Sequence, residues 1–209
     1  MNIVYFDHET SGLSPLEGAE PIEIAAIMLD PDLTEISRFG PRLMRCNKPE
    51  LANHKAIAVS GHTLDEIQAI GEDPALVYVE FVTWVIENSN GAKVLPAGHN
   101  VQFDIQFLRW AFKEYLPDLD YEKVFDYHSI CTFVVSYFKK VICERTTKSD
   151  GSKLKCNLTA LGKYYRLEHD AHQAMGDVEV GVQLMRILKD EMLGLSGVQV
   201  AGSLPSNSM

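Results

Sequence analysis

Four acidic residues stand where an element is expected to begin or end. Asp7 and Glu9 are two positions apart at the end of an expected strand, so their side chains project to the same side of it. Asp104 and Asp177 each fall in the first turns of an expected helix. Taken singly, each residue has a simpler interpretation: a surface acid that closes a strand, or a favourable negative charge at a helix N-terminus.

Taken together, the four carboxylates point to a metal site. Carboxylates drawn onto one spot repel each other unless cations neutralise them, and Mg²⁺ or Mn²⁺ prefers such oxygen ligands. Two such ions about 3.5–4 Å apart can stabilise the attacking and leaving oxygens of a phosphoryl displacement. His172 lies five residues before Asp177, and an imidazole with a pKa of about 6.5 is suited to accept a proton from the attacking water. A lone histidine at such a position is more often a cap or a surface residue.

Three separated segments contain these five residues. Their sequences are F-D-H-E-T-S-G-L over residues 6–13, G-H-N-V-Q-F-D-I-Q-F-L over residues 98–108 and A-H-Q-A-M-G-D over residues 171–177. They resemble the motifs D-x-E-T-x-G-L, H-N-x-x-F-D-x-x-F-L and A-H-x-A-x-x-D of the DnaQ-like (DEDD) exonucleases, a family that includes ribonuclease T and the epsilon subunit of bacterial DNA polymerase III. I-E-I-A over residues 22–25 and V-S-G-H-T over residues 59–63 are weaker similarities. The three motifs occur in order, and the resemblance spans roughly residues 2–190.

This resemblance implies a fold and a mechanism. The fold is an α/β, ribonuclease H-like one, in which a central mixed sheet (an antiparallel meander plus parallel strands) is flanked by helices. Two Mg²⁺ (or Mn²⁺) ions would be held by Asp7, Glu9, Asp104 and Asp177. His172 would be the general base. In this family the residue that orients the water is a histidine five residues before the last aspartate or a tyrosine four before it. Here His172 and Gln173 fill these places, which is the DEDDh pattern.

The resemblance also assigns substrate contacts. The backbone of Thr10 would lie beside the terminal 3′ hydroxyl, and Leu13 would press against the last base. Phe103 and His62 would lie along the terminal nucleotides, although the position of His62 is usually aliphatic in relatives. From the residues alone, Leu13 and Phe103 could equally be core residues, and His62 could belong to a surface turn. His8, between the first two acids, is interpreted as a bystander.

Hydrophobic patterning predicts the strands that position these residues. Residues 2–7 form a short apolar run rich in β-branched and aromatic side chains. Strands are also expected over residues 21–30 and 35–46, with a turn at Pro31-Asp32, so that the first three strands form an antiparallel meander. Later strands are expected over residues 93–97 and near Val124-Phe125.

Helical periodicity predicts four helices. The first runs from Asp73-Pro74 to residue 88, with a buried stripe of Leu76, Val79, Val82 and Ile86. The second covers residues 101–115, with Val101, Ile105, Leu108 and Phe112 on one face, and Asn100 is interpreted as its cap. The third covers residues 128–138. The fourth covers residues 173–192, with Val178, Val182, Met185 and Leu188 facing inward.

Two segments lack such patterning. Residues 139–157 are interpreted as a long polar loop, whose charged residues are Lys139, Lys140, Arg145, Lys148, Lys153 and Lys155 against Glu144 and Asp150. In so acidic a chain this basic loop could bind the phosphates of a strand, or it could be an ordinary solvated loop. Residues 194–209 are expected to form a flexible tail, which leaves an exonuclease domain over residues 1–193.

The composition is that of a globular protein. The 209 residues, 46% of them hydrophobic, fit one domain with a large core. The four cysteines form no C-x-x-C pair, so neither a zinc site nor a disulfide framework is expected. No signal peptide or membrane-spanning apolar run is predicted, and a cytoplasmic protein is expected. The net charge of −10 disfavours nonspecific binding of nucleic acid, but bound divalent cations reverse the local sign at an acidic site.

These observations favour a metal-dependent 3′→5′ exonuclease that acts on single-stranded or frayed 3′ ends, with DNA favoured over RNA. An oligoribonuclease-like activity on short RNA is an alternative. A catalytically inactive module that binds nucleic acid or a polymerase is another, although all four acids and the histidine are present. A structural calcium site would need ligands clustered in one loop, a spacing that the sequence does not contain. The 3′ end of single-stranded DNA or RNA is the expected partner, and a DNA polymerase is a candidate second partner.

Overall fold

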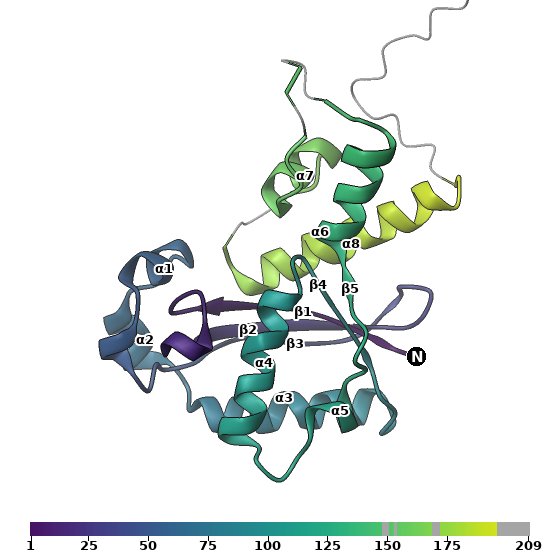
Figure 1. Ribbon diagram of the computed structural model, residues 1–209. Helices are drawn as coiled ribbons and strands as arrows, with labels where there is room; N and C mark the ends of the chain where they lie inside the picture. Colours follow the sequence, from purple (N-terminus) through teal and green to yellow (C-terminus); the bar gives the residue numbers. More distant parts are fainter. Residues whose placement is uncertain (148–150, 153, 169–171, 196–209) are drawn as a thin grey trace, which may run out of the picture.

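A mixed sheet lies at the centre of the molecule (Figure 1). The computed structural model describes residues 1–147, 151–152, 154–168 and 172–195. Within them the strands are β1 (Ile3–Thr10), β2 (Pro21–Leu29), β3 (Glu35–Leu43), β4 (Leu95–Gly98) and β5 (Ile130–Cys131), in the order β3-β2-β1-β4-β5. β2 pairs antiparallel with β1 and with β3, whereas β4 pairs parallel with β1 and with β5. The expected antiparallel meander plus parallel strands is confirmed.

Side-chain alternation along β1 builds a hydrophobic core on each face of the sheet. Ile3 and Tyr5 face α8 (Ala174–Met192), together with alternate residues of β2. Val4 and Phe6 face α3 (Pro74–Asn88) and α4 (Gln102–Tyr115) on the other side. β2 is buried along its whole length, as expected of a strand that helices cover on both faces.

The remaining helices extend this layered body. α1 (His54–Val59) and α2 (Leu64–Ile70) pack beside the start of β2, and α5 (Tyr121–Val124) lies near α3. α6 (Thr132–Ser136), the π-helix η3 (Tyr137–Cys143) and α7 (Leu158–Tyr165) pack on the C-terminal half of α8 and form the upper lobe in Figure 1. Two short 3₁₀ helices are η1 (Pro15–Glu17) and η2 (Pro49–Leu51).

The buried faces of the long helices agree with the sequence patterns except in α3. The predicted inward faces of α4 and α8 are buried. The predicted stripe of α3 is wrong, because Leu76, Val79 and Ile86 are exposed. The buried residues of α3 are Pro74, Val77, Tyr78, Phe81, Val82 and Val85. Apolar side chains occur around most of this helix, so periodicity alone could not identify the buried face.

The region after α4 departs further from expectation. The strand predicted near Val124-Phe125 is wrong, since residues Tyr121–Val124 form α5 and Phe125 makes only an isolated bridge to Val94. The edge strand is instead β5, which pairs with β4. The helix predicted over residues 128–138 begins at Thr132 and continues through η3 to Cys143. Helices α1, α2 and α7 were not predicted. A two-residue strand is defined by its partner, which local patterning cannot supply.

Several expectations concern parts of the chain that bear less on the site. No helix of the described residues is long and apolar enough to cross a membrane. Cys46, Cys131, Cys143 and Cys156 are all free. Of the expected flexible tail, residues 196–209 lie outside the described residues.

Candidate active site

The candidate site lies at the edge of the sheet where the parallel strands β1 and β4 end. Open α/β sheets commonly bind ligands at this edge. The chain leaves β4 at Gly98 and turns through His99 and Asn100 into α4, whose first turn contains Asp104. The predicted side-chain cap by Asn100 is wrong, since the N-cap of α4 is Val101 and no side chain caps it. Asn100 instead has a φ of 64°, a left-handed conformation that asparagine tolerates better than most residues.

Strand parity and the start of α8 bring the other acids to the same edge. Asp7 and Glu9 are half-buried, and they follow Ile3 and Tyr5 on the face of β1 that α8 covers. Ligand atoms of Glu9, His172 and Asp177 all lie within 4.8 Å of one another. His172 is exposed and lies two residues before Ala174, where α8 begins.

The carboxylates interact strongly. Burial raises the pKa of Asp7 well above its ordinary value, and the charges of Asp104 and Asp177 raise it further. Burial, followed by the charges of Asp177, Glu23 and Asp104, raises the pKa of Glu9 to about 8. Burial also raises the pKa of Asp104, although contacts with His8 oppose the shift. A cluster in which each acid disfavours the ionisation of its neighbours, and whose donors are oxygens, suits a hard divalent cation.

A fifth acid, Glu23, belongs to the same cluster. It lies opposite Glu9 in the β1–β2 pair and is buried. Its carboxylate Oε2 is 3.4 Å from Nε2 of His62, whose Nδ1 lies 3.5 Å from Oε2 of Glu66. The resemblance includes Glu23 in its I-E-I-A segment but assigns it no role. Its acidic side chain within an otherwise apolar run was the signal in the sequence, whereas its place opposite Glu9 depends on how β2 pairs with β1.

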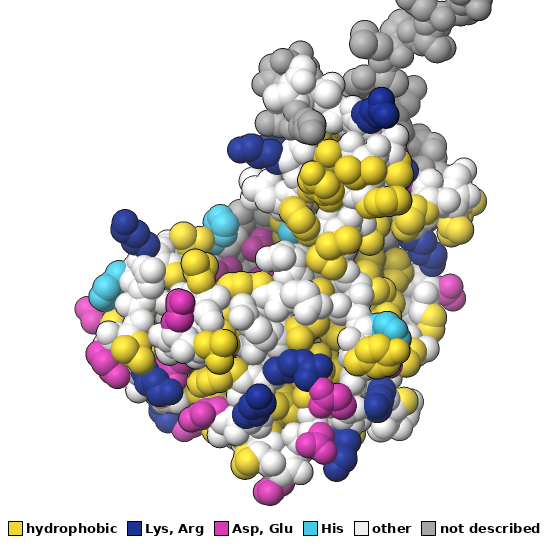
Figure 2. Space-filling model, in the orientation of Figure 1, with side chains coloured by type: hydrophobic (Ala, Val, Ile, Leu, Met, Phe, Trp, Pro, Cys, Tyr) yellow, Lys and Arg dark blue, Asp and Glu magenta, His cyan; other side chains and the backbone are white. Residues whose placement is uncertain are grey.

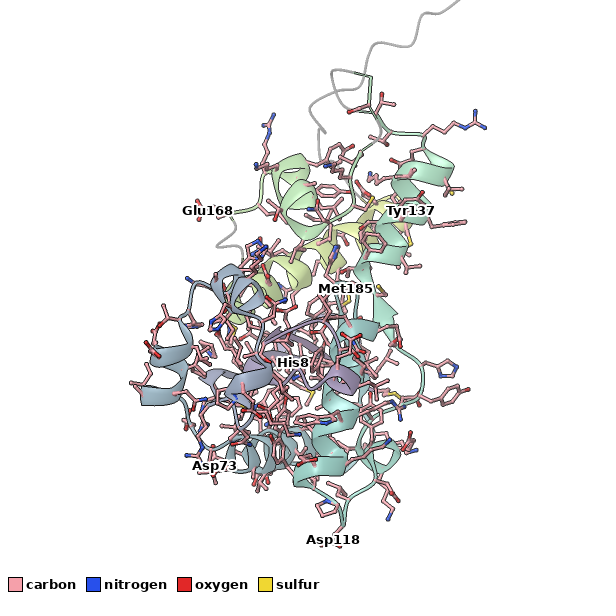
Figure 3. All side chains as sticks on the ribbon, turned by 60° about the vertical axis from the view of Figure 1, so that its left-hand side comes forward. His8, Asp73, Asp118, Tyr137, Glu168 and Met185 are labelled. Atoms are coloured by element: carbon pink, nitrogen blue, oxygen red, sulfur yellow. The ribbon has the colours of Figure 1, made fainter. Side chains whose placement is uncertain are left out.

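His8, which the sequence suggests is a bystander, contacts Asp104 and Tyr78. It is buried on the α3/α4 face of β1, between the two acids that face α8. Figure 3 shows it inside the body of the molecule. Its backbone N–H donates a hydrogen bond to Oδ1 of Asp104 (2.9 Å), and its Nε2 lies 3.0 Å from the hydroxyl of Tyr78 in α3.

Comparison with known families assigns the chain to one of them. The sequence profile of the family described as Exonuclease (RNase_T) matches residues 4–185. The chain belongs to this DnaQ-like exonuclease family. No curated protein matches it.

Solved structures of Exonuclease I share the fold of this exonuclease-family chain, which is ribonuclease H-like. The E. coli enzyme in complex with a dT13 oligonucleotide has a TM-score of 0.74 at 22% identity, covering 92% of this chain and 42% of that chain. Exonuclease I from Methylocaldum szegediense has a TM-score of 0.74 at 21% identity, covering 93% and 41%. The zinc-bound form of the E. coli Exonuclease I–ssDNA complex has a TM-score of 0.74 at 22% identity, covering 93% and 41%. The chain thus spans less than half the length of these proteins.

The residues expected to contact substrate have different environments in this exonuclease-family chain. Thr10 is buried, and its hydroxyl donates to the carbonyl of Gly12 (2.7 Å). Leu13 is 78% exposed, which excludes its interpretation as a core residue. Phe103 is half-buried, with its ring 5.2 Å from that of Phe107. His62 is half-buried in its contacts with the two glutamates. In Figure 2, acidic and histidine side chains gather in the hollow between the α1 corner and the upper lobe.

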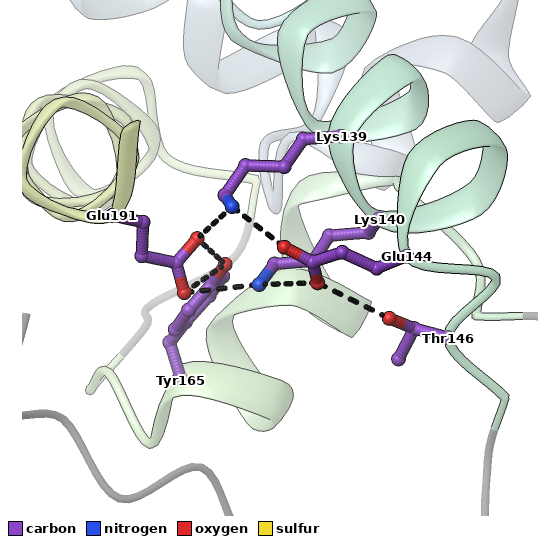
Figure 4. A network of polar contacts seen from close by, with 6 residues as sticks. All are labelled: Lys139, Lys140, Glu144, Thr146, Tyr165 and Glu191. Atoms are coloured by element: carbon purple, nitrogen blue, oxygen red, sulfur yellow. Dashed lines mark hydrogen bonds and ion pairs between the residues drawn. The ribbon is translucent and has the colours of Figure 1, made fainter. Parts of the chain in front are cut away.

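The prediction of a basic loop over residues 139–157 is partly wrong. Lys139 and Lys140 lie in η3 and form ion pairs with Glu144 and Glu191 (Figure 4). Lys140 is buried, and the hydroxyl of Tyr165 donates to the same Glu191. Carboxylates within the fold therefore already neutralise these two lysines. Arg145 and Lys155 are exposed, whereas Lys148, Asp150 and Lys153 lie outside the described residues.

Proposed function

We propose that the chain is a metal-dependent 3′→5′ exonuclease of the DEDDh type that hydrolyses single-stranded DNA. The observation that carries this proposal is the convergence of Glu9, His172 and Asp177, whose ligand atoms lie within 4.8 Å of one another. Asp7 and Asp104 add two carboxylates that interact with this group. The family match supports nuclease chemistry at this place.

Each residue has a role in this proposal. Two Mg²⁺ or Mn²⁺ ions, when bound, supply the positive charge that an in-line phosphoryl displacement needs at its attacking and leaving oxygens. Asp7, Glu9, Asp104 and Asp177 would hold these ions. The imidazole of His172 accepts the proton of the attacking water, and its exposure beside Glu9 leaves it accessible to that water.

The substrate proposal rests on the surface around the site and on the structural relatives. Leu13 offers an exposed apolar side chain to the last base, and Phe103 and His62 offer half-buried rings to the terminal nucleotides. In this proposal the backbone of Thr10 would lie beside the 3′ hydroxyl. E. coli Exonuclease I has been crystallised with a dT13 oligonucleotide, which supports single-stranded DNA as the substrate. Association with a DNA polymerase stays a prediction.

The test is cleavage of a 5′-labelled strand in Mg²⁺ or Mn²⁺, with DNA and RNA of equal sequence run side by side. We expect a ladder that shortens from the 3′ end, is faster on DNA, and disappears with EDTA. Asp7→Asn should abolish it, whereas Asp118→Asn, an exposed acid distant from the site in Figure 3, should not. Faster cleavage of RNA would favour the oligoribonuclease alternative. No cleavage of either strand by folded, metal-replete protein would favour the binding module.

A further inference from the structure

A chain of three buried polar side chains runs from α3 through β1 to α4. The hydroxyl of Tyr78 lies 3.0 Å from Nε2 of His8. Nδ1 of His8 lies 3.6 Å from Oδ1 of Asp104, the oxygen that also accepts the backbone N–H of His8. The three residues are at most 4% exposed.

The chemistry of the three side chains determines which of their atoms donates and which accepts. An ionised carboxylate only accepts hydrogen bonds, and a neutral imidazole has one donor and one acceptor nitrogen. The tautomer that suits Asp104 therefore has its hydrogen on Nδ1, because the other tautomer would place a lone pair against the carboxylate. Nε2 is then an acceptor, and the hydroxyl of Tyr78 donates to it. Among the described residues, Nδ1 of His8 makes no hydrogen bond, and its polar contact is the one with Oδ1 of Asp104 at 3.6 Å.

Packing alone does not explain a histidine at this place. The side chain of His8 follows Val4 and Phe6 on the most apolar face of the sheet, and a polar ring buried there is unfavourable unless its nitrogens find partners. Both of its contacts with Asp104 fall on Oδ1. They hold one oxygen of this carboxylate on the core side.

We propose that Tyr78 and His8 are positioning residues that orient the Asp104 carboxylate for binding a divalent cation. The inference rests on the proposed function, since it takes Asp104 as a metal ligand. Groups that hydrogen-bond to the ligands of a metal fix their orientation, and their loss typically reduces metal affinity about 10–100-fold. Tyr78 and His8 thus act on the metal through Asp104, without touching the metal or the substrate.

The experiment is calorimetric titration of the full chain with Mn²⁺ in the absence of nucleic acid. Tyr78→Phe removes the hydroxyl but keeps the ring that stacks on Tyr115, 5.8 Å between centroids. We expect a Kd for Mn²⁺ about 10-fold higher. The matched control is Tyr121→Phe, which removes another buried hydroxyl, one that makes no hydrogen bond with the described residues. The control should leave the Kd unchanged, and thermal melting should show both variants folded.

Two substitutions of His8 test whether this residue donates towards Asp104 from its δ position. His8→Asn carries its amide nitrogen at the δ position and can still donate towards Asp104, whereas His8→Gln carries it at the ε position. The Asn variant should therefore retain tighter Mn²⁺ binding than the Gln variant. In exonuclease assays, excess Mn²⁺ should restore kcat in Tyr78→Phe, because only metal binding is weakened.

Asp104→Asn separates failure of this inference from failure of the proposed function. If Asp104→Asn weakens Mn²⁺ binding but Tyr78→Phe and His8→Gln change the Kd by less than about twofold, the positioning role is wrong and the metal site stands. The range expected from comparable groups lies well above that limit. If Asp104→Asn itself leaves Mn²⁺ binding unchanged, Asp104 is not a ligand, and both the inference and the proposed site are wrong.

Discussion

Gly181 controls how closely α8 approaches the sheet, and Gly181→Ala tests whether this approach positions the site. A Cβ atom at Gly181 would lie 2.1 Å from Oη, 2.4 Å from Cζ and 2.5 Å from Cε1 of Tyr5. Non-bonded carbon atoms pack at about 3.5–4.0 Å, so Tyr5 or α8 has to move by about 1 Å or more. Tyr5 is buried, and its hydroxyl is 2.9 Å from Oγ1 of Thr132. We therefore expect α8 to move.

The expected loss of stability follows from three contributions. Replacing glycine by alanine inside a helix stabilises it by about 1 kcal/mol. Overpacking costs about 1–3 kcal/mol, and loss of the buried hydrogen bond between Tyr5 and Thr132 adds about 1–3 kcal/mol. The net result is a free energy of unfolding lower by about 1–5 kcal/mol. Asp177 lies one turn before Gly181 on the same face of α8, and a displacement of about 1 Å there could reduce the cleavage rate about 10²-fold.

Urea denaturation and the single-strand cleavage assay measure the two effects. Gln183→Ala, an exposed position on the same helix, is the matched control and should change neither. Tyr5→Phe removes the closest contact, so the double variant with Gly181→Ala should lose less stability than the sum of the single variants, a coupling of about 0.5–3 kcal/mol. If Gly181→Ala is as stable and active as the wild type, the close packing of α8 on β1 does not position Asp177.

Three further predictions concern the base, the pH dependence and the upper lobe. His172→Ala should lower the turnover number about 10²–10⁴-fold with little effect on urea denaturation, and an unchanged rate would exclude it as the base. Burial raises the pKa of Glu9 to about 8 from its ordinary 4.5, so binding of Mn²⁺ below pH 8 has to displace a proton. The affinity for Mn²⁺ should therefore rise between pH 4.5 and pH 8 and then level off. A flat profile in calorimetry at several pH values would contradict this. For the same reason the metal-free protein should lose stability as pH rises through this range, and Mn²⁺ should restore it. Lys140→Met leaves the buried side chain of Glu191 without its closest cation, so the free energy of unfolding should fall by about 3 kcal/mol. The affinity for Mn²⁺ should stay unchanged. Glu191 lies 14 residues after Asp177 on α8, which places it about 21 Å away.

Local sequence patterns determined much of the fold and the identity of the acids. The period of two along β1 placed Asp7 and Glu9 on one face of the sheet. The helical period identified the buried faces of α4 and α8. The motifs named the residues that the structure brings to one edge. These features could be predicted because each depends on the order of residues within a single element.

Packing between distant segments fixes which partners these elements meet. The link between His8 and Asp104 joins residues 96 positions apart, and Glu23 enters the site because β2 pairs with β1 in one register. Lys140 has the sequence context of a loop cation, but the fold buries it against Glu191. The face of α3 that carries Tyr78 was also misassigned from its pattern. The physical reason is the same in each case: a side chain's charge or polarity is fixed by its type, whereas the group that neutralises or accepts it is fixed by packing between distant segments.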